Sequence, residues 1–69
     1  MKNAIDAAAD LGREFAEYLN QSNDRDNWSE LENNDDLPEE DYVTLRAEFG
    51  EVTSEMERAY KSAFNAALS

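Results

Sequence analysis

Hydrophobic side chains recur at helical spacing near the start of the chain. Steps of three and four residues place side chains on one face of an α-helix, and alanine, which favours helix, is abundant here. The polar run Asn20-Gln21-Ser22-Asn23 then ends the pattern. The sequence therefore predicts a helix over residues 4–20. Its apolar face consists of Ile5, Ala8, Gly12, Phe15 and Leu19.

The C-terminal half repeats this pattern and predicts a helix over 38–67. Asp36 and Glu39 have the spacing of a capping box, and Pro38 suits the first turn. Gly50 interrupts the helix formers, and Ser54 with Glu57 would cap a second helix there. The apolar phase continues through Gly50, which favours one long helix and leaves a kink or break open. The apolar stripe is Tyr42, Leu45, Phe49, Val52, Met56, Ala59, Ala63 and Ala66, widened by Tyr60, Phe64 and Leu68.

Few large apolar residues lie between the two predicted helices. Trp28 and Leu31 stand three residues apart and indicate a short helix or turn near 25–32. We expect Trp28 to cover the open edge of the helix pair, although tryptophan also serves as an exposed anchor for partners. The expected fold is all-α: an antiparallel helical hairpin within one domain, 1–69. A domain of this size is either a monomer closed by the Trp28 segment or a homodimer.

Composition excludes several function classes. The chain has 17 acidic and six basic residues, no histidine and no cysteine, and its formal net charge is −11. It therefore lacks the residues for a disulfide, a thiolate nucleophile, a Cys/His zinc site or an imidazole base. The charge also disfavours direct binding to nucleic acid or to anionic membranes. No apolar run approaches the roughly 18 residues of a membrane span, and no signal peptide is recognisable. We expect a cytoplasmic protein of a bacterial host cell.

The net charge is concentrated in the middle of the chain. Residues 21–41 contain nine acidic side chains and one basic side chain, Arg25, and so carry −8 of the −11. Glu39, Glu40 and Asp41 would lie in the first turn of a helix, where the helix dipole favours negative charge. The remaining acids form either a solvated loop or an interaction surface.

Acidic residues also recur along both predicted helices. Asp6, Asp10, Glu14 and Glu17 follow one another at steps of three or four, and so do Glu48, Glu51 and Glu55. Like charges at such spacing destabilise a helix by a few tenths of a kcal/mol per pair. The stripes are therefore either the solvent face of an acidic protein or an extension of the central acidic surface.

Neither catalysis nor specific metal binding is expected. Paired carboxylates catalyse reactions only where burial or neighbouring charges separate their pKa values, and so short a chain has little capacity for a cleft. Residues 24–30 place oxygen ligands at alternate positions, faintly like a calcium loop. The glycine and glutamate that such a loop requires at its sixth and twelfth positions are absent: Ser29 and Asp35 stand there. We expect no enzyme activity, no cofactor and no metal.

The spacing of the carboxylates suggests a mimic of nucleic acid. Neighbouring carboxylates on a helix face or an extended chain stand roughly 6–7 Å apart, and phosphates along a DNA strand are spaced similarly. In size, charge and helicity the chain resembles small acidic DNA-mimic inhibitors encoded by phages and plasmids, which block restriction enzymes, CRISPR effectors or nucleoid proteins. This resemblance implies a non-catalytic inhibitor or regulator that binds a basic protein, such as a host nucleic-acid-binding protein or nuclease complex.

Two alternatives remain open beside this hypothesis. One is a helical structural or assembly module that pairs through the Tyr42–Ala66 stripe, and the other is an acidic antitoxin. The residues predicted to form the interaction surface are Asp24, Asp26, Trp28, Glu30, Glu32, Asp35 and Asp36, extended by Asp6, Asp10, Glu14, Glu48, Glu51 and Glu55.

Overall fold

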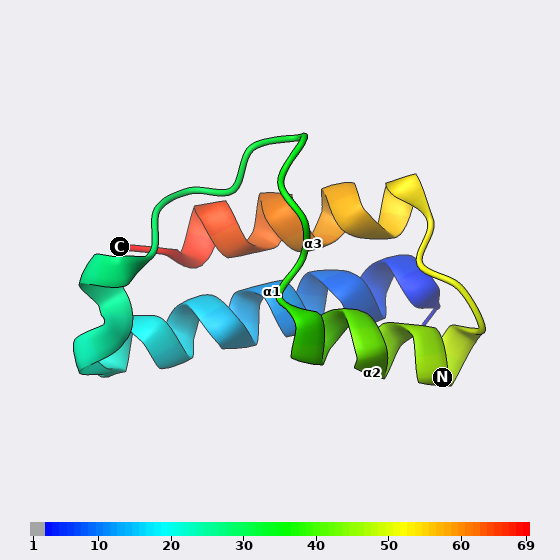
Figure 1. The fold of residues 1–69 in the computed structure, drawn as a ribbon, viewed down its shortest axis with the longest axis horizontal. Helices are drawn as coiled ribbons and strands as arrows, with labels where there is room; N and C mark the ends of the chain where they lie inside the picture. The colour runs from blue at the N-terminus through cyan, green and yellow to red at the C-terminus, as the bar shows by residue number, and fades with distance from the viewer. Residues whose placement is uncertain (1–2) are drawn as a thin grey trace.

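The chain folds into three α-helices and one short 3₁₀ helix (Figure 1). The computed structural model describes residues 3–69, apart from the side chains of Asn23 and Arg25. It contains no strand within this range, and the all-α prediction is confirmed. The elements are α1 (Ala4–Gln21), η1 (Asn23–Asn27), α2 (Glu39–Phe49) and α3 (Ser54–Ala67).

Helix α1 agrees with the helix predicted over residues 4–20. Asn3 is its N-cap, and the side-chain oxygen accepts a hydrogen bond from the Asp6 N–H at 2.8 Å. This bond satisfies one of the amides that a helix start leaves without a partner. The backbone becomes extended at Ser22, within the polar run that was expected to stop the helix.

The helix predicted over residues 38–67 is broken at Gly50, which is one of the alternatives that the sequence left open, and the favoured single long helix does not form. Gly50 adopts a left-handed conformation, with φ of 83°, and its N–H donates to the Arg46 carbonyl at 2.8 Å. Glycine ends helices in this way because it lacks the Cβ that disfavours positive φ. The new helix is capped by Thr53 rather than Ser54, since the Thr53 hydroxyl accepts from the Met56 N–H.

The cap predicted for the start of this region is also wrong. Helix α2 begins at Glu39, and Pro38 occupies the N-cap position without a side-chain hydrogen bond. Asp36 therefore does not cap α2. The first turn instead contains Glu39, Glu40 and Asp41, as predicted, in the position that the helix dipole favours.

The break at Gly50 changes the direction of the final helix. In Figure 1, α2 runs antiparallel to α1, as predicted, whereas α3 turns back and runs parallel to α1. The ends of α1 and α3 meet, because the Asn20 amide donates to the Ala67 carbonyl at 2.8 Å and accepts from the Ser69 N–H. The N-terminal helix does pair with the C-terminal half, but the antiparallel direction holds only for α2.

Helices α1 and α3 form the closest contact of the molecule. Gly12 faces Tyr60, and a Cβ at position 12 would lie 2.3 Å from the Tyr60 carbonyl oxygen. The absence of a side chain at Gly12 thus allows the two helices to approach. The buried apolar residues are Ala8, Ala16, Leu19, Leu37, Leu45, Met56, Tyr60 and Phe64.

The apolar stripe predicted for the C-terminal half is only partly buried. Tyr60 and Phe64, expected at its margin, are fully buried, whereas Tyr42 is 37% exposed and Ala66 is also exposed. The break explains this difference, because α2 and α3 no longer share one helical phase.

Trp28 covers the core, as expected, but the helix predicted near 25–32 is shorter than expected. The 3₁₀ helix ends at Asn27, and residues 28–32 have no helical structure. The Trp28 ring packs edge-on against Phe15, with 4.9 Å between centroids, and lies 6.1 Å from Phe64. In the described part of the chain, no helix is long and apolar enough to cross a membrane.

Candidate functional site

Part of the acidic stretch between α1 and α2 is fixed against helix α3. We call residues 28–38, between η1 and α2, the acidic linker. The Asn65 side chain receives a hydrogen bond from the Leu31 N–H at 2.7 Å and donates to the Leu31 carbonyl at 2.9 Å. A single asparagine of α3 thus holds both backbone groups of one linker residue, as a neighbouring strand would.

A second anchor lies one turn earlier on α3. The Lys61 ammonium donates to the Asn33 carbonyl at 3.0 Å and lies 4.0 Å from a Glu57 carboxylate oxygen. Lys61 is only 4% exposed, and a buried charge is tolerated where such polar partners surround it. The linker is therefore attached to α3 at two successive turns, and Leu37 adds an apolar contact with the core at its end.

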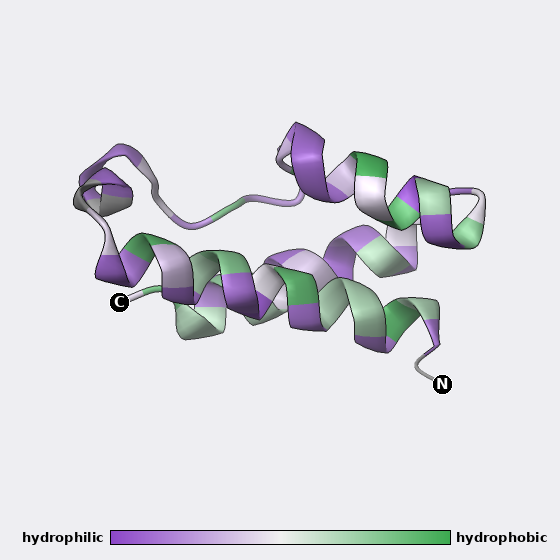
Figure 2. Cartoon of the chain, turned by 90° about the horizontal axis from the view of Figure 1, so that it is seen from below, coloured by the Kyte–Doolittle hydropathy of each residue, from purple (hydrophilic) through white to green (hydrophobic). Residues whose placement is uncertain are grey.

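The acidic side chains of this linker lie at the surface of the molecule. Glu30, Glu32, Asp35 and Asp36 are all exposed, and Figure 2 shows the linker as mostly hydrophilic between the more apolar helices. Asp35 also has a structural role, because its carboxylate accepts from the Glu32 N–H at 2.7 Å and closes a turn. Four predicted site residues thus share one exposed segment with a defined backbone.

Asp24 and Asp26 lie in η1, at the end of α1 (Figure 1). Both are exposed, and the Asp24 N–H donates to the Ser22 hydroxyl at 3.2 Å. The chain continues from η1 into Trp28, the first residue of the acidic linker, and the Trp28 ring packs against Phe15 and Phe64. The structure therefore brings these two acids to the same end of the molecule as the start of the linker.

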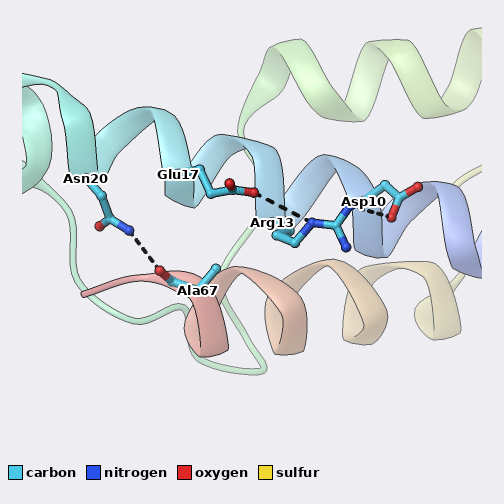
Figure 3. A network of polar contacts seen from close by, with 5 residues as sticks. All are labelled: Asp10, Arg13, Glu17, Asn20 and Ala67. Carbon is cyan, nitrogen blue, oxygen red and sulfur yellow. Dashed lines mark hydrogen bonds and ion pairs between the residues drawn. The ribbon is translucent and has the colours of Figure 1, made fainter.

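The acidic stripe on α1 is partly neutralised. Arg13 contacts Asp10 at 3.1 Å and Glu17 at 3.6 Å, so two carboxylates share one guanidinium (Figure 3). Exposed pairs of this type stabilise a protein little, but they reduce the negative charge of this face. Asp6 is exposed in the first turn of the helix.

The second predicted stripe does not exist as a helix face. Glu48 lies in α2, Glu51 in the turn after Gly50, and Glu55 in the first turn of α3. Helical spacing requires one continuous helix, and the break removes it. These three acids are exposed around the α2–α3 turn instead.

Acids from different elements meet beside the start of α2. A groove of about 410 Å³, which we call the α1–α2 groove, separates α1 from the first turn of α2. Three carboxylates line it: Glu14 from α1 and Glu40 and Asp41 from α2. Its other lining residues are Leu11, Phe15, Tyr18 and Pro38.

The carboxyl of Asp41 has an unusual environment in this groove. Burial raises its pKa, and the neighbouring charges of Glu40 and Glu14 act in the same direction. The buried Tyr60 hydroxyl donates a hydrogen bond to the Asp41 carboxylate, which opposes this rise. The same burial and hydrogen bond raise the pKa of Tyr60. Through this bond α3 holds the first turn of α2 in place.

A second groove lies on the other side of the α2 start. It has a volume of about 430 Å³ and is lined by Asp36, Leu37, Glu39, Tyr42 and Glu57. From the sequence, the acids of the first α2 turn were explained by the helix dipole alone, and their place on these grooves was not predicted. No local pattern could have revealed it, because Glu14 and Glu57 come from distant parts of the chain.

The acids of the described residues form no metal-binding cluster, because no three of them gather closely enough to hold a metal ion. Comparison with protein-family models, curated proteins and solved structures gave no match to this chain. The function is therefore inferred from the geometry of the acidic linker and the grooves.

Proposed function

We propose that this protein is a non-catalytic acidic inhibitor or regulator, which binds a basic protein surface that normally holds nucleic acid. We place its target in the cytoplasm of a bacterial cell, as a nucleic-acid-binding protein or nuclease complex. The observation that carries the proposal is the attachment of the acidic linker to α3, which holds Glu30, Glu32 and Asp36 at fixed backbone positions.

This attachment supports binding because it reduces the entropy lost on association. A free loop would lose conformational freedom when it docked, whereas a linker already held by Asn65 and Lys61 loses less. Its charges then approach a partner as one pattern. Such a surface speeds encounter with an oppositely charged partner and weakens as salt screens it.

The spacing within the linker fits the target class. Glu30 and Glu32 stand two residues apart on a non-helical backbone, where alternate side chains of an extended chain are roughly 6–7 Å apart. A DNA strand carries one phosphate for each 3.4 Å of helix axis, which gives a similar distance along its backbone. A groove lined with lysine and arginine to hold phosphates is therefore complementary to this linker.

The assembly-module alternative loses the surface on which it depended. It required one continuous apolar stripe from Tyr42 to Ala66, and the break at Gly50 divides this stripe between two helices of opposite direction. Leu45 and Met56, two of its central members, are buried within the chain's own core.

A pull-down from a nuclease-treated bacterial lysate tests the proposal. The immobilised protein is washed with rising salt, and the released proteins are identified by mass spectrometry. We expect basic nucleic-acid-binding proteins, released at moderate salt because exposed charges are screened. Proteins that resist salt and are not basic would contradict the proposal.

Matched variants make this experiment specific for the linker. The triple variant Glu30→Lys, Glu32→Lys and Asp36→Lys leaves the turn at Asp35 intact and should lose the captured protein. The control is Glu48→Lys, Glu51→Lys and Glu55→Lys, which makes the same change in net charge at the α2–α3 turn and should retain much more. Equal losses in both variants would show that only net charge matters.

A further inference from the structure

The α1–α2 groove is lined by both apolar and acidic side chains. Leu11 and Phe15 contribute from α1, and Pro38 contributes from the end of the linker. Tyr18 lies one turn beyond Phe15 and two turns beyond Leu11, and it is 59% exposed. The groove thus presents aliphatic, aromatic and carboxylate groups to the same space.

The carboxylates of this groove have no cationic partner in the described part of the chain. Arg13 is the only basic residue of α1, and its guanidinium pairs with Asp10 and Glu17 (Figure 3). None of the ion pairs between described residues includes Glu14, Glu40 or Asp41. These three groups therefore present negative charge that the fold does not neutralise.

We propose that the α1–α2 groove receives an arginine side chain from a basic segment of the partner protein. The inference rests on the proposed function and deepens it, since it assigns a specific receptor beside the acidic linker. The aliphatic stem of the arginine packs on Leu11, Phe15 and Pro38. Its guanidinium reaches the three carboxylates of the groove, which accept its hydrogen bonds, and the face of Tyr18 stacks against it.

The shape and charge of the groove favour this occupant over others. Its three carboxylates form no cluster that could hold a metal ion among the described residues, and several acceptors in one groove suit a cation with several donors. A second copy of this chain, with a net charge of −11, would be repelled by the same carboxylates. The volume of about 410 Å³ lies near the lower end of the range for small-ligand sites.

The environment of Asp41 is consistent with a cationic occupant. Burial raises the pKa of this carboxyl first of all, the Tyr60 hydrogen bond opposes the rise, and Glu40 and Glu14 add to it by repulsion. A guanidinium between these carboxylates would relieve the repulsion. The Tyr60 hydroxyl occupies one Asp41 oxygen and leaves the other available to accept from a ligand.

A titration followed by NMR tests the inference. The probe is a hexa-arginine peptide, acetylated and amidated at its ends, added to the ¹⁵N-labelled protein at near-physiological salt. The control is the matching hexa-citrulline peptide, which keeps the shape but lacks the charge. We expect the largest shift changes at the amides of residues 11–18 and 39–41 with hexa-arginine and none with hexa-citrulline.

Two pairs of variants separate the groove from general charge. Glu14→Gln and Tyr18→Ala should each weaken hexa-arginine binding by about threefold, the size expected for one exposed ion pair or cation–π contact. Glu48→Gln and Tyr42→Ala are the matched controls, because they remove the same groups outside this groove. They should change the affinity less than the groove variants do.

The outcomes distinguish this inference from the proposed function. Shifts confined to residues 30–36, or equal shifts with hexa-citrulline, would overturn the groove and leave the acidic linker as the binding surface. Equal weakening by groove and control variants would overturn it as well. If the wild-type protein captures no basic protein from a lysate, the proposed function fails, and the peptide titration still decides whether the groove recognises arginine.

Discussion

The α1–α3 pair and the segment formed by the acidic linker and α2 are held in place by different forces. The helix pair is packed through small and apolar residues, with Gly12 against the Tyr60 backbone and Phe64 fully buried. The other segment places a single residue of α2, Leu45, fully in the core. Trp28, Leu31 and Leu37 add apolar contacts from the linker, and side-chain hydrogen bonds from α3 fix its backbone and the start of α2.

The residues that contribute most to stability are therefore different from those that we assign to binding. Apolar burial provides most of the favourable free energy of folding, and it does not depend on the relative orientation of the buried groups. Hydrogen bonds contribute less but fix orientation. The acids that we assign to binding lie on the part that hydrogen bonds position, so they can be changed with little effect on the helix pair.

The largest expected effect comes from removing the ring at the centre of the helix pair. Phe64→Ala should lower the free energy of unfolding by about 3–5 kcal/mol, as for buried aromatic residues in general. Phe49→Ala should cost less, because Phe49 is only partly buried. Urea denaturation followed by circular dichroism measures both. A larger loss of stability for Phe49→Ala than for Phe64→Ala would show that the core is not centred on the α1–α3 pair.

The close approach of α1 and α3 gives the next prediction. Gly12→Ala should destabilise the protein by about 1–3 kcal/mol, because the added methyl group meets backbone atoms that cannot rotate away. Gly50→Ala meets no atom within 4 Å and should cost about 1–2 kcal/mol through its left-handed conformation alone. Thermal denaturation of the two variants compares them. A stabilised Gly12→Ala variant would contradict the close contact.

The linker should loosen when its main anchor is removed. Asn65→Ala eliminates two hydrogen bonds to Leu31 and should cost about 1–2 kcal/mol. Hydrogen exchange at the Leu31 amide should accelerate, whereas exchange in the middle of α1 should change much less. Asn34→Ala, at an exposed position of the linker, serves as the control. Unchanged exchange at Leu31 in Asn65→Ala would show that the linker is held by other contacts.

The Asp41–Tyr60 bond predicts a dependence of stability on pH at both extremes. The pKa of Asp41 is raised above 3.8, so the folded protein binds this proton more tightly than the unfolded chain. Stability should therefore increase as the pH falls from 7 through the raised pKa toward 3.8. The pKa of Tyr60 is raised above 10.0, so stability should fall above pH 10, by at most about 1.4 kcal/mol per pH unit.

Melting temperatures between pH 4 and 11 measure this dependence. Asp41→Asn should flatten the acidic part, and Tyr60→Phe should remove the alkaline part. A melting temperature that falls steadily from pH 7 to 4 would mean that paired carboxylates outweigh Asp41 and the repulsion among the exposed acids.

The sequence predicted the elements whose signals are local. Helix α1 followed from its period and from the polar run that begins at Asn20. A break at Gly50 was one of the open alternatives, but one long helix was favoured, because the apolar phase is the same on both sides and periodicity alone did not distinguish a turn from a kink. The parallel direction of α3 was therefore not predicted.

The candidate site was predicted in composition but not in arrangement. The acids of the linker were identified from charge alone. The contacts that fix them join residues far apart in the chain, such as Leu31 and Asn65, and no local pattern indicates such pairs. The same reason explains why Glu14 was not connected to Asp41.

Competition with nucleic acid shows whether the acidic linker occupies a surface that normally holds phosphates. A basic protein captured from the lysate is bound to a fluorescent DNA duplex, and release of the duplex is followed as this protein is added at two salt concentrations. We predict release by the wild type, weaker at the higher salt, and little release by the Glu30→Lys, Glu32→Lys and Asp36→Lys variant. A folded triple variant that releases the duplex as well as the wild type would show that the acidic linker is only a solvated surface and not the binding surface.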